Sequence, residues 1–170
     1  LAVGAPGTGF VDIGFVRIYR YVFNSSSGLF QWEQVGQMLT GTDYGDNYGT
    51  TIGMNSTGDK ICVGAYEGQV LGRRGYVKAY EFDPVAEKWV QYGNTIAGTV
   101  DDALVGRSVD FDQDGTSVVV ASGTLITGNV TIYDYDDASD VWLQRGSAIN
   151  STKTGSRVKI SNDGNIVASN

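Results

Sequence analysis

Residues 75–93 read GYVKAYEFDPVAEKWVQYG, and this stretch returns twice in altered form. Residues 14–36 read GFVRIYRYVFNSSSGLFQWEQVG, and residues 128–146 read GNVTIYDYDDASDVWLQRG. In each copy a glycine opens an alternating run of β-branched and aromatic residues, a polar turn follows, and a second run carries one tryptophan. Alternation of this kind is typical of strands, so the three copies predict three antiparallel hairpins.

A second motif stands between these hairpins. It joins a short apolar run to a turn that ends in glycine, and its copies begin at Tyr48, Val105 and Thr154. Each copy is followed by another apolar run that ends in small residues, as in Cys62-Val-Gly-Ala65. One repeat unit therefore contains four short strands.

The repeat has the length of a propeller blade. Trp32, Trp89 and Trp142 stand 57 and then 53 residues apart. Four strands in about 50–60 residues are typical of a β-propeller, whereas a parallel solenoid, the alternative, has a shorter coil. We predict an all-β fold of four-stranded antiparallel propeller blades. The sequence is expected to supply about three blades of a larger, seven-bladed ring, and therefore to be part of a longer protein. The predicted units are 1–47 (partial), 48–104, 105–153 and 154–170 (partial).

Short motifs in these units resemble a known repeat. Tyr48-Gly49 and Val105-Gly106, with Gly4-Ala5-Pro6 and Gly64-Ala65, resemble degenerate forms of the FG-GAP repeat. That repeat builds the seven-bladed propeller of integrin alpha subunits and of many secreted proteins, so the resemblance implies a propeller of this kind. The glycine-opened strands are also similar to WD-type blades, although the Gly-His signature is missing and Tyr133-Asp134 replaces Trp-Asp.

The composition excludes several classes of function. A net charge of −7 argues against a nucleic-acid partner, because such surfaces concentrate lysine and arginine. The absence of histidine removes the commonest general base and metal ligand. Cys62 is the only cysteine, lies in an apolar run and is expected to be a buried side chain. No apolar run approaches the ~20 residues that span a membrane.

One stretch resembles the start of a calcium loop. Asp110, Asp112 and Asp114 alternate before Gly115, but the twelfth position of an EF-hand loop falls on Ala121. The ninth position of an integrin-type loop falls on Val118, so both closing ligands are missing. The other units carry a small polar residue and glycine at this place, which favours a hairpin turn over a weak calcium site. We expect no cofactor, with calcium as the alternative.

Two loops between units are acidic. They carry Asp43 and Asp46 in one and Asp101 and Asp102 in the other, and either a solvated loop or an acidic rim agrees with the sequence. The recurring tryptophans and tyrosines are expected to pack, because a binding site usually breaks a repeat.

Four Asn-x-Ser/Thr sequons indicate an extracellular or cell-surface glycoprotein. They begin at Asn24, Asn55, Asn129 and Asn150, of which Asn24 and Asn55 fall in predicted turns. With no catalytic residue pattern in sight, we predict a non-enzymatic structural or adhesive scaffold. Its expected partners are other proteins, including copies of itself, and N-linked glycans. The alternatives are a ligand-binding propeller, such as a lectin or calcium-dependent receptor head, and a glycan hydrolase with two acidic residues.

Overall fold

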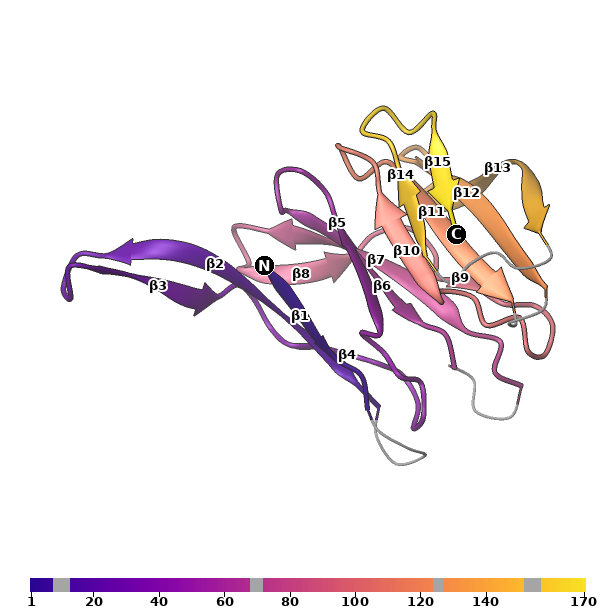
Figure 1. Cartoon of the computed structure of the whole chain (residues 1–170). Coiled ribbons are helices and arrows are strands. Elements are labelled where there is room, and N and C mark those ends of the chain that lie inside the picture. The colour runs from indigo at the N-terminus through magenta and orange to yellow at the C-terminus, as the bar shows by residue number, and fades with distance from the viewer. Residues whose placement is uncertain (8–12, 68–71, 124–126, 152–156) are drawn as a thin grey trace.

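The computed structural model describes residues 1–7, 13–67, 72–123, 127–151 and 157–170. Regular structure in these residues consists of strands alone, and the strands form four antiparallel sheets that follow one another along the chain (Figure 1). No helix in the described part of the chain is long and apolar enough to cross a membrane.

Each sheet is one blade, and the strands of a blade run in sequence order from one edge to the other. Blade 1 contains β1 (Ala2–Ala5), β2 (Phe15–Asn24), β3 (Leu29–Gln34) and β4 (Leu39–Thr40). Blade 2 contains β5 (Thr51–Met54), β6 (Lys60–Ala65), β7 (Tyr76–Asp83), β8 (Lys88–Gln91) and β9 (Ile96–Ala97). Blade 3 contains β10 (Ser108–Phe111), β11 (Ser117–Gly123), β12 (Gly128–Asp136) and β13 (Val141–Ser151). The two strands of blade 4 are β14 (Val158–Ile160) and β15 (Val167–Ser169).

Blade 2 shows the four-stranded plan in full. β5, β6 and β7 pair in order, and β8 and β9 both pair with β7 as two halves of one interrupted fourth strand. Blade 3 has a continuous fourth strand, β13, and its pairing with β12 shifts in register between Val130 and Ile132 of β12. In blade 1, β1 pairs with β2 as β6 pairs with β7, so β1 holds the second place in its blade. The predicted all-β fold of four-stranded antiparallel propeller blades is confirmed, and each sheet lies inside one predicted unit.

Three hydrophobic cores lie between successive blades. Val16 and Ile18 of blade 1 pack against a buried group from blade 2 that includes Ile61 and Val63. A second core joins blades 2 and 3, and a third joins blade 3 to β14 and β15. Because both faces of an inner blade are covered, the middle of its second strand is apolar on both sides, as in the Val118–Ala121 segment of β11.

The recurring tryptophan fastens each blade to the one before it. Trp89 donates its indole N–H to the Val35 carbonyl at 2.9 Å, and a Cβ added to Gly36 would lie 2.8 Å from its Cδ1. Trp142 repeats the contact one blade later, with Gly93 beneath its ring. Each copy of the motif Trp-x-Gln-x-Gly therefore takes part in two contacts between blades. Its tryptophan packs on the glycine of the preceding blade, and its glycine makes room for the tryptophan of the next. The prediction that these tryptophans pack is confirmed for Trp89 and Trp142.

The loops that connect one blade to the next share a backbone shape. Asn47 and Leu104 hold equivalent positions and have φ angles of 52° and 48°, in the left-handed region that side chains rarely adopt. Gly49 and Gly106 follow at 89° and 88°. These loops lie at the same end of the blades as the last residues of β6 and β11, because Thr51 pairs with Gly64 and Ser108 pairs with Ala121, and we call this end the loop face.

Candidate functional site

The three aspartates of the calcium-like stretch have different surroundings and different partners. Asp110 is buried on β10 and reaches the neighbouring strand β14, where it accepts hydrogen bonds from the Ile160 N–H at 3.1 Å and from the Lys159 ammonium at 2.8 Å. Asp110 therefore ties the first strand of blade 3 to the first strand of blade 4.

Asp112 and Asp114 belong to the hairpin turn that follows. The Asp112 carboxylate accepts from the Thr116 N–H at 2.9 Å and from the Thr116 hydroxyl at 3.1 Å, while Asp114 is exposed. Asn55 holds the equivalent turn of blade 2, where its side-chain Oδ1 accepts from the backbone N–H groups of Gly58 and Lys60 at 3.0 Å each. The three aspartates do not converge, and the described residues contain no group of three or more His, Cys, Asp or Glu side chains that could hold a metal ion.

The acidic loops do not form a free acidic rim. Asp101 and Asp102 pair with Arg74 and Arg73 at 2.8 and 3.1 Å, across two loops of blade 2. These four side chains are exposed enough that each pair contributes little to stability. The two loops are held together mainly by the backbone, where the Leu104 and Val105 N–H groups donate to the Arg73 and Arg74 carbonyls at 3.1 and 2.9 Å.

Asp46 is fully buried and organises the loop between blades 1 and 2. One carboxylate oxygen accepts from the Thr42 and Asp43 N–H groups at 2.9 and 3.0 Å and from the hydroxyl of Tyr76. Burial and this bond raise the pKa of Tyr76. The other oxygen, Oδ1, has no hydrogen-bond partner among the described residues. Asp46 is closed off from solvent, so it shapes the loop face and is not placed to touch a substrate.

A partly exposed cluster of opposite charges lies beside it on the loop face. Asn47 donates to the Glu67 carboxylate at 2.5 Å, and Glu67 lies next to Tyr66 at the end of β6. Burial raises the pKa of Tyr66, the Glu67 charge and hydrogen bond raise it further, and the charges of Arg107 and Arg73 oppose this. Arg107 opens blade 3 and donates to the Gly123 carbonyl at 3.2 Å. We call Asn47, Tyr66, Glu67 and Arg107 the Glu67 cluster.

The cluster combines a carboxylate, a phenol and a guanidinium, which can accept a proton, donate a hydrogen bond and bind an anion. Sequence reasoning missed it, although a signal was present. Arg107 takes the place that Thr50 and Ser156 hold in the other units, so it breaks the repeat.

The four sequon asparagines lie in different surroundings. Asn129 and Asn150 are exposed and stand directly opposite each other on β12 and β13. Asn24 is partly exposed at a hairpin turn, and Asn55 is 7% exposed with its amide nitrogen bonded to Thr57 and Asp59. Thr152, which completes the Asn150 sequon, lies outside the described residues. Glycosylation of these sites stays a prediction.

Comparison with solved structures relates the fold to that of enzymes. A "putative 6-phosphogluconolactonase" from Bacteroides uniformis matches with a TM-score of 0.57 and 14% identity, over 93% of this chain and 43% of its own. Another from Bacteroides fragilis matches with a TM-score of 0.57 and 13% identity, over 93% of this chain and 44% of its own. The Dos1 propeller follows with a TM-score of 0.46 and 20% identity, over 93% and 39%. The chain therefore spans less than half the length of these neighbours.

No family model matches the sequence, and neither does any curated protein. The resemblance to the FG-GAP repeat stays a prediction. The prediction of a non-enzymatic structural or adhesive scaffold is wrong, because both structural neighbours with TM-scores of 0.57 carry the name of an enzyme. A sequence without histidine can still carry catalytic groups, because carboxylates, tyrosines and arginines also perform acid–base and electrostatic catalysis.

Proposed function

We propose that this chain is part of a β-propeller hydrolase that opens a lactone ring of a phosphorylated sugar acid, with the Glu67 cluster on the loop face as its site. One observation carries the proposal. Glu67 is a partly exposed carboxylate that Asn47 holds in place, with the Tyr66 phenol beside it and with the Arg107 charge acting on that phenol. The fold likeness to lactonases supports the reaction class, and the geometry supplies the roles of the residues.

Glu67 acts as the general base. It takes a proton from a water molecule while the water oxygen bonds to the lactone carbonyl carbon. The ring carbon–oxygen bond then breaks, and the proton passes from Glu67 to the leaving ring oxygen, which yields the free sugar acid. Asn47 orients the carboxylate through its 2.5 Å hydrogen bond, so that one oxygen faces the water.

Arg107 and Tyr66 stabilise negative charge on the substrate. The guanidinium offers several N–H groups in a planar fork that suits a phosphate or the developing carbonyl oxyanion. An ordinary phenol pKa of about 10 already leaves Tyr66 protonated at neutral pH, and the raised pKa of Tyr66 extends this to higher pH, so the phenol remains a hydrogen-bond donor. An anionic substrate is compatible with the protein's net charge of −7 only where such cations gather.

The test is hydrolysis of 6-phosphogluconolactone by the purified chain, followed as acid release above the spontaneous rate. Glu67→Gln should lower kcat by about 100-fold or more, the contribution of a general base. Arg107→Gln should mainly raise KM for the phosphorylated lactone and leave the unphosphorylated lactone less affected. Glu87→Gln, an exposed glutamate in the β7–β8 turn, is the matched control and should retain full activity. Equal rates for Glu67→Gln and the unchanged chain would remove this site from the reaction.

We also propose that the protein is extracellular and glycosylated. The support is the exposed pair Asn129 and Asn150, whose side chains lie on opposite members of one strand pair. Material from a eukaryotic secretory host should lose mass on enzymatic deglycosylation, and an unchanged mass would contradict the proposal.

A further inference from the structure

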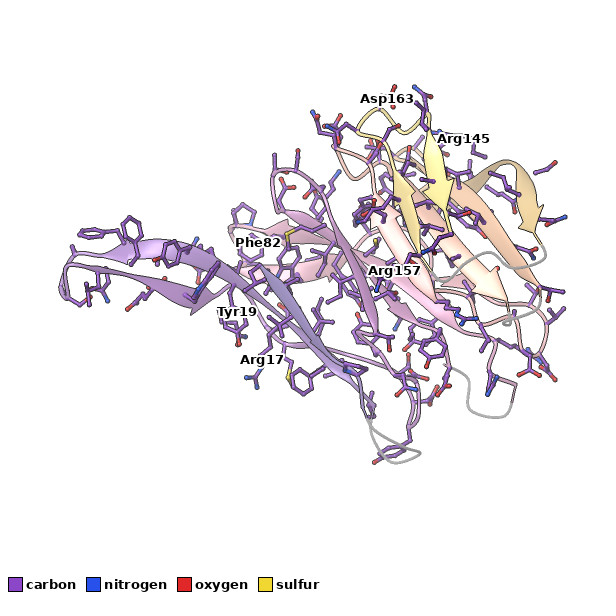
Figure 2. The ribbon with its side chains drawn as sticks, viewed as in Figure 1. Arg17, Tyr19, Phe82, Arg145, Arg157 and Asp163 are labelled. Atoms are coloured by element: carbon purple, nitrogen blue, oxygen red, sulfur yellow. The ribbon has the colours of Figure 1, made fainter. Side chains whose placement is uncertain are left out.

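A pocket opens on blade 2 at the end that lies away from the loop face. It has a volume of about 410 Å³ and is formed by the β7–β8 hairpin, where Phe82 is labelled in Figure 2. Its lining consists of Glu81, Phe82, Asp83, Pro84, Val90 and Tyr92. Blades 1 and 3 pack on the two faces of blade 2, and the pocket remains open beside them.

Aromatic rings and carboxylates meet beside this pocket. Tyr92 contacts Tyr135 of blade 3 with the ring centroids 4.9 Å apart and the ring planes nearly perpendicular. Burial raises the pKa of both phenols, and nearby negative charges, Glu81 among them, raise it further. Asp137 and Asp140 add to the negative charge that acts on Tyr135. Because carboxylates and ring faces both attract cations, the surroundings of the pocket suit a positively charged group.

Blade 3 shows how the equivalent carboxylate is satisfied within the chain. Asp134 holds the place of Glu81, and Arg145 holds the place of Tyr92. Arg145 donates its Nε–H to Asp134 Oδ2 at 2.7 Å and its Nη2–H to Asp134 Oδ1 at 2.5 Å. This bidentate pair is the strongest way in which two side chains neutralise a carboxylate.

Blade 2 lacks this internal partner. Glu81 is exposed, and no ion pair reaches it among the described residues. Lys60 stands opposite Glu81 on β6, but its ammonium lies over the Tyr92 ring, 5.4 Å from the centroid. In blade 1 the two places hold Arg20 and Val35, so an acidic residue without a guanidinium occurs in blade 2 and breaks the repeat.

We propose that this pocket binds an arginine side chain of a partner protein. The guanidinium binds both oxygens of the Glu81 carboxylate, in the manner of the bidentate pair in blade 3, and faces the Tyr92 ring. The aliphatic part of the arginine lies along Pro84 and Val90, which are both exposed. The net charge of −7 favours the approach of a basic segment. The pocket lies at the other end of blade 2 from the Glu67 cluster, so the proposal does not depend on hydrolysis.

Titration of the chain with N-acetyl-arginine amide, followed by backbone amide chemical shifts, tests the proposal. We expect saturable shifts that concentrate on Glu81, Val90 and Tyr92, with the weak affinity of a single side chain. N-acetyl-citrulline amide has nearly the same shape without the charge and should not bind. N-acetyl-lysine amide should bind more weakly, because an ammonium cannot form the bidentate contact.

Three variants test the residues of the pocket. Glu81→Gln keeps the size of the side chain and should weaken binding of the arginine compound by about tenfold or more. Glu87→Gln removes the same charge from the exposed turn of the same hairpin and should leave the affinity unchanged. Lys60→Met removes the ammonium that competes for Glu81 and should tighten binding by about threefold, the size of a surface charge interaction.

A further variant copies blade 3 into blade 2. Tyr92 donates its hydroxyl to the Gly115 carbonyl of the next blade at 2.8 Å, and Arg145 donates to the Gly164 carbonyl at 2.6 Å. Tyr92→Arg should therefore place a guanidinium on Glu81 within the chain and remove binding, with an unchanged circular dichroism spectrum.

Several results would overturn the proposal. They are the absence of saturable shifts, equal binding of the arginine and citrulline compounds, shifts that map to another surface, and an unchanged affinity of the Glu81→Gln chain. If Tyr92→Arg does not fold, the comparison of Glu81→Gln with Glu87→Gln still decides, because both changes remove one exposed charge from the same hairpin.

Discussion

An alanine series at the three tryptophan seats tests the joint between blades. Gly36, Gly93 and Gly146 have φ angles of 67°, 68° and 63°, so an alanine pays the same backbone strain at each, roughly 1–2 kcal/mol. The surroundings differ. The added Cβ at position 93 would lie 2.5 Å from two atoms of the Trp142 ring, at position 36 it would lie 2.8 Å from Trp89, and at position 146 it meets no described atom.

The expected losses of stability follow from these distances. Gly146→Ala should cost the strain alone. Gly93→Ala should cost about 1–3 kcal/mol more, because the Trp142 ring must shift out of a packed core. Gly36→Ala should fall between the two. For a chain of this size each kcal/mol lowers the melting temperature by roughly 2–4 °C, so the separation is measurable.

Urea unfolding followed by tryptophan fluorescence gives the free energies of unfolding, and the three variants are compared at the same protein concentration. Equal losses at positions 93 and 146 would refute the claim that the glycine exists to seat the next blade's tryptophan.

Three further predictions concern single residues. Burial raises the pKa of the Cys62 thiol, so this group should not react with a thiol reagent until the protein unfolds, and rapid labelling of the native chain would contradict its burial. Asp112→Ala should destabilise the protein by about 1–3 kcal/mol, because it leaves the Thr116 N–H without its acceptor, whereas Asp114→Ala should stay within about 0.5 kcal/mol. A hydrogen bond from Arg145 lowers the pKa of Asp134, so the stabilisation is present above the usual aspartate pKa of about 4 and is lost as pH falls through the lowered value. Because Arg145 also holds the Gly164 carbonyl at 2.6 Å, beside Asp163 in Figure 2, acidification should speed hydrogen exchange in blade 4 first, and uniform exchange across all blades would count against this.

The sequence predicted the fold well because the repeat samples the same physics several times. Alternating apolar positions, turn glycines and tryptophans predict the same strands in each unit. Where the pattern of one strand is weak, the equivalent strands of the other units identify it. The turn assignment of Asp112 rested on the same comparison with Asn55, and the hydrogen bonds of both residues support it.

The candidate site was not predictable in the same way. Tyr66 and Arg107 lie 41 residues apart in the sequence and in different blades, and the Arg107 charge acts on Tyr66 only because blades 2 and 3 stack side by side. Asp110 was read as part of a local loop, but its partners Lys159 and Ile160 come from the next blade. A repeat shows what every unit needs, and contacts between units depend on how the blades stack.

The loops between blades have one backbone shape and two unrelated sequences. Residues 41–49 and 98–106 share only glycines and one threonine, yet the φ angles at Asn47 and Leu104 differ by only a few degrees. Shape is therefore specified by the glycines and by the strands on either side, while the exposed positions are free to change and the buried Asp46 and Tyr48 are not. The exposed side chains of such a loop can be exchanged between blades, or replaced in a library, to give the loop face a new specificity without redesign of the scaffold.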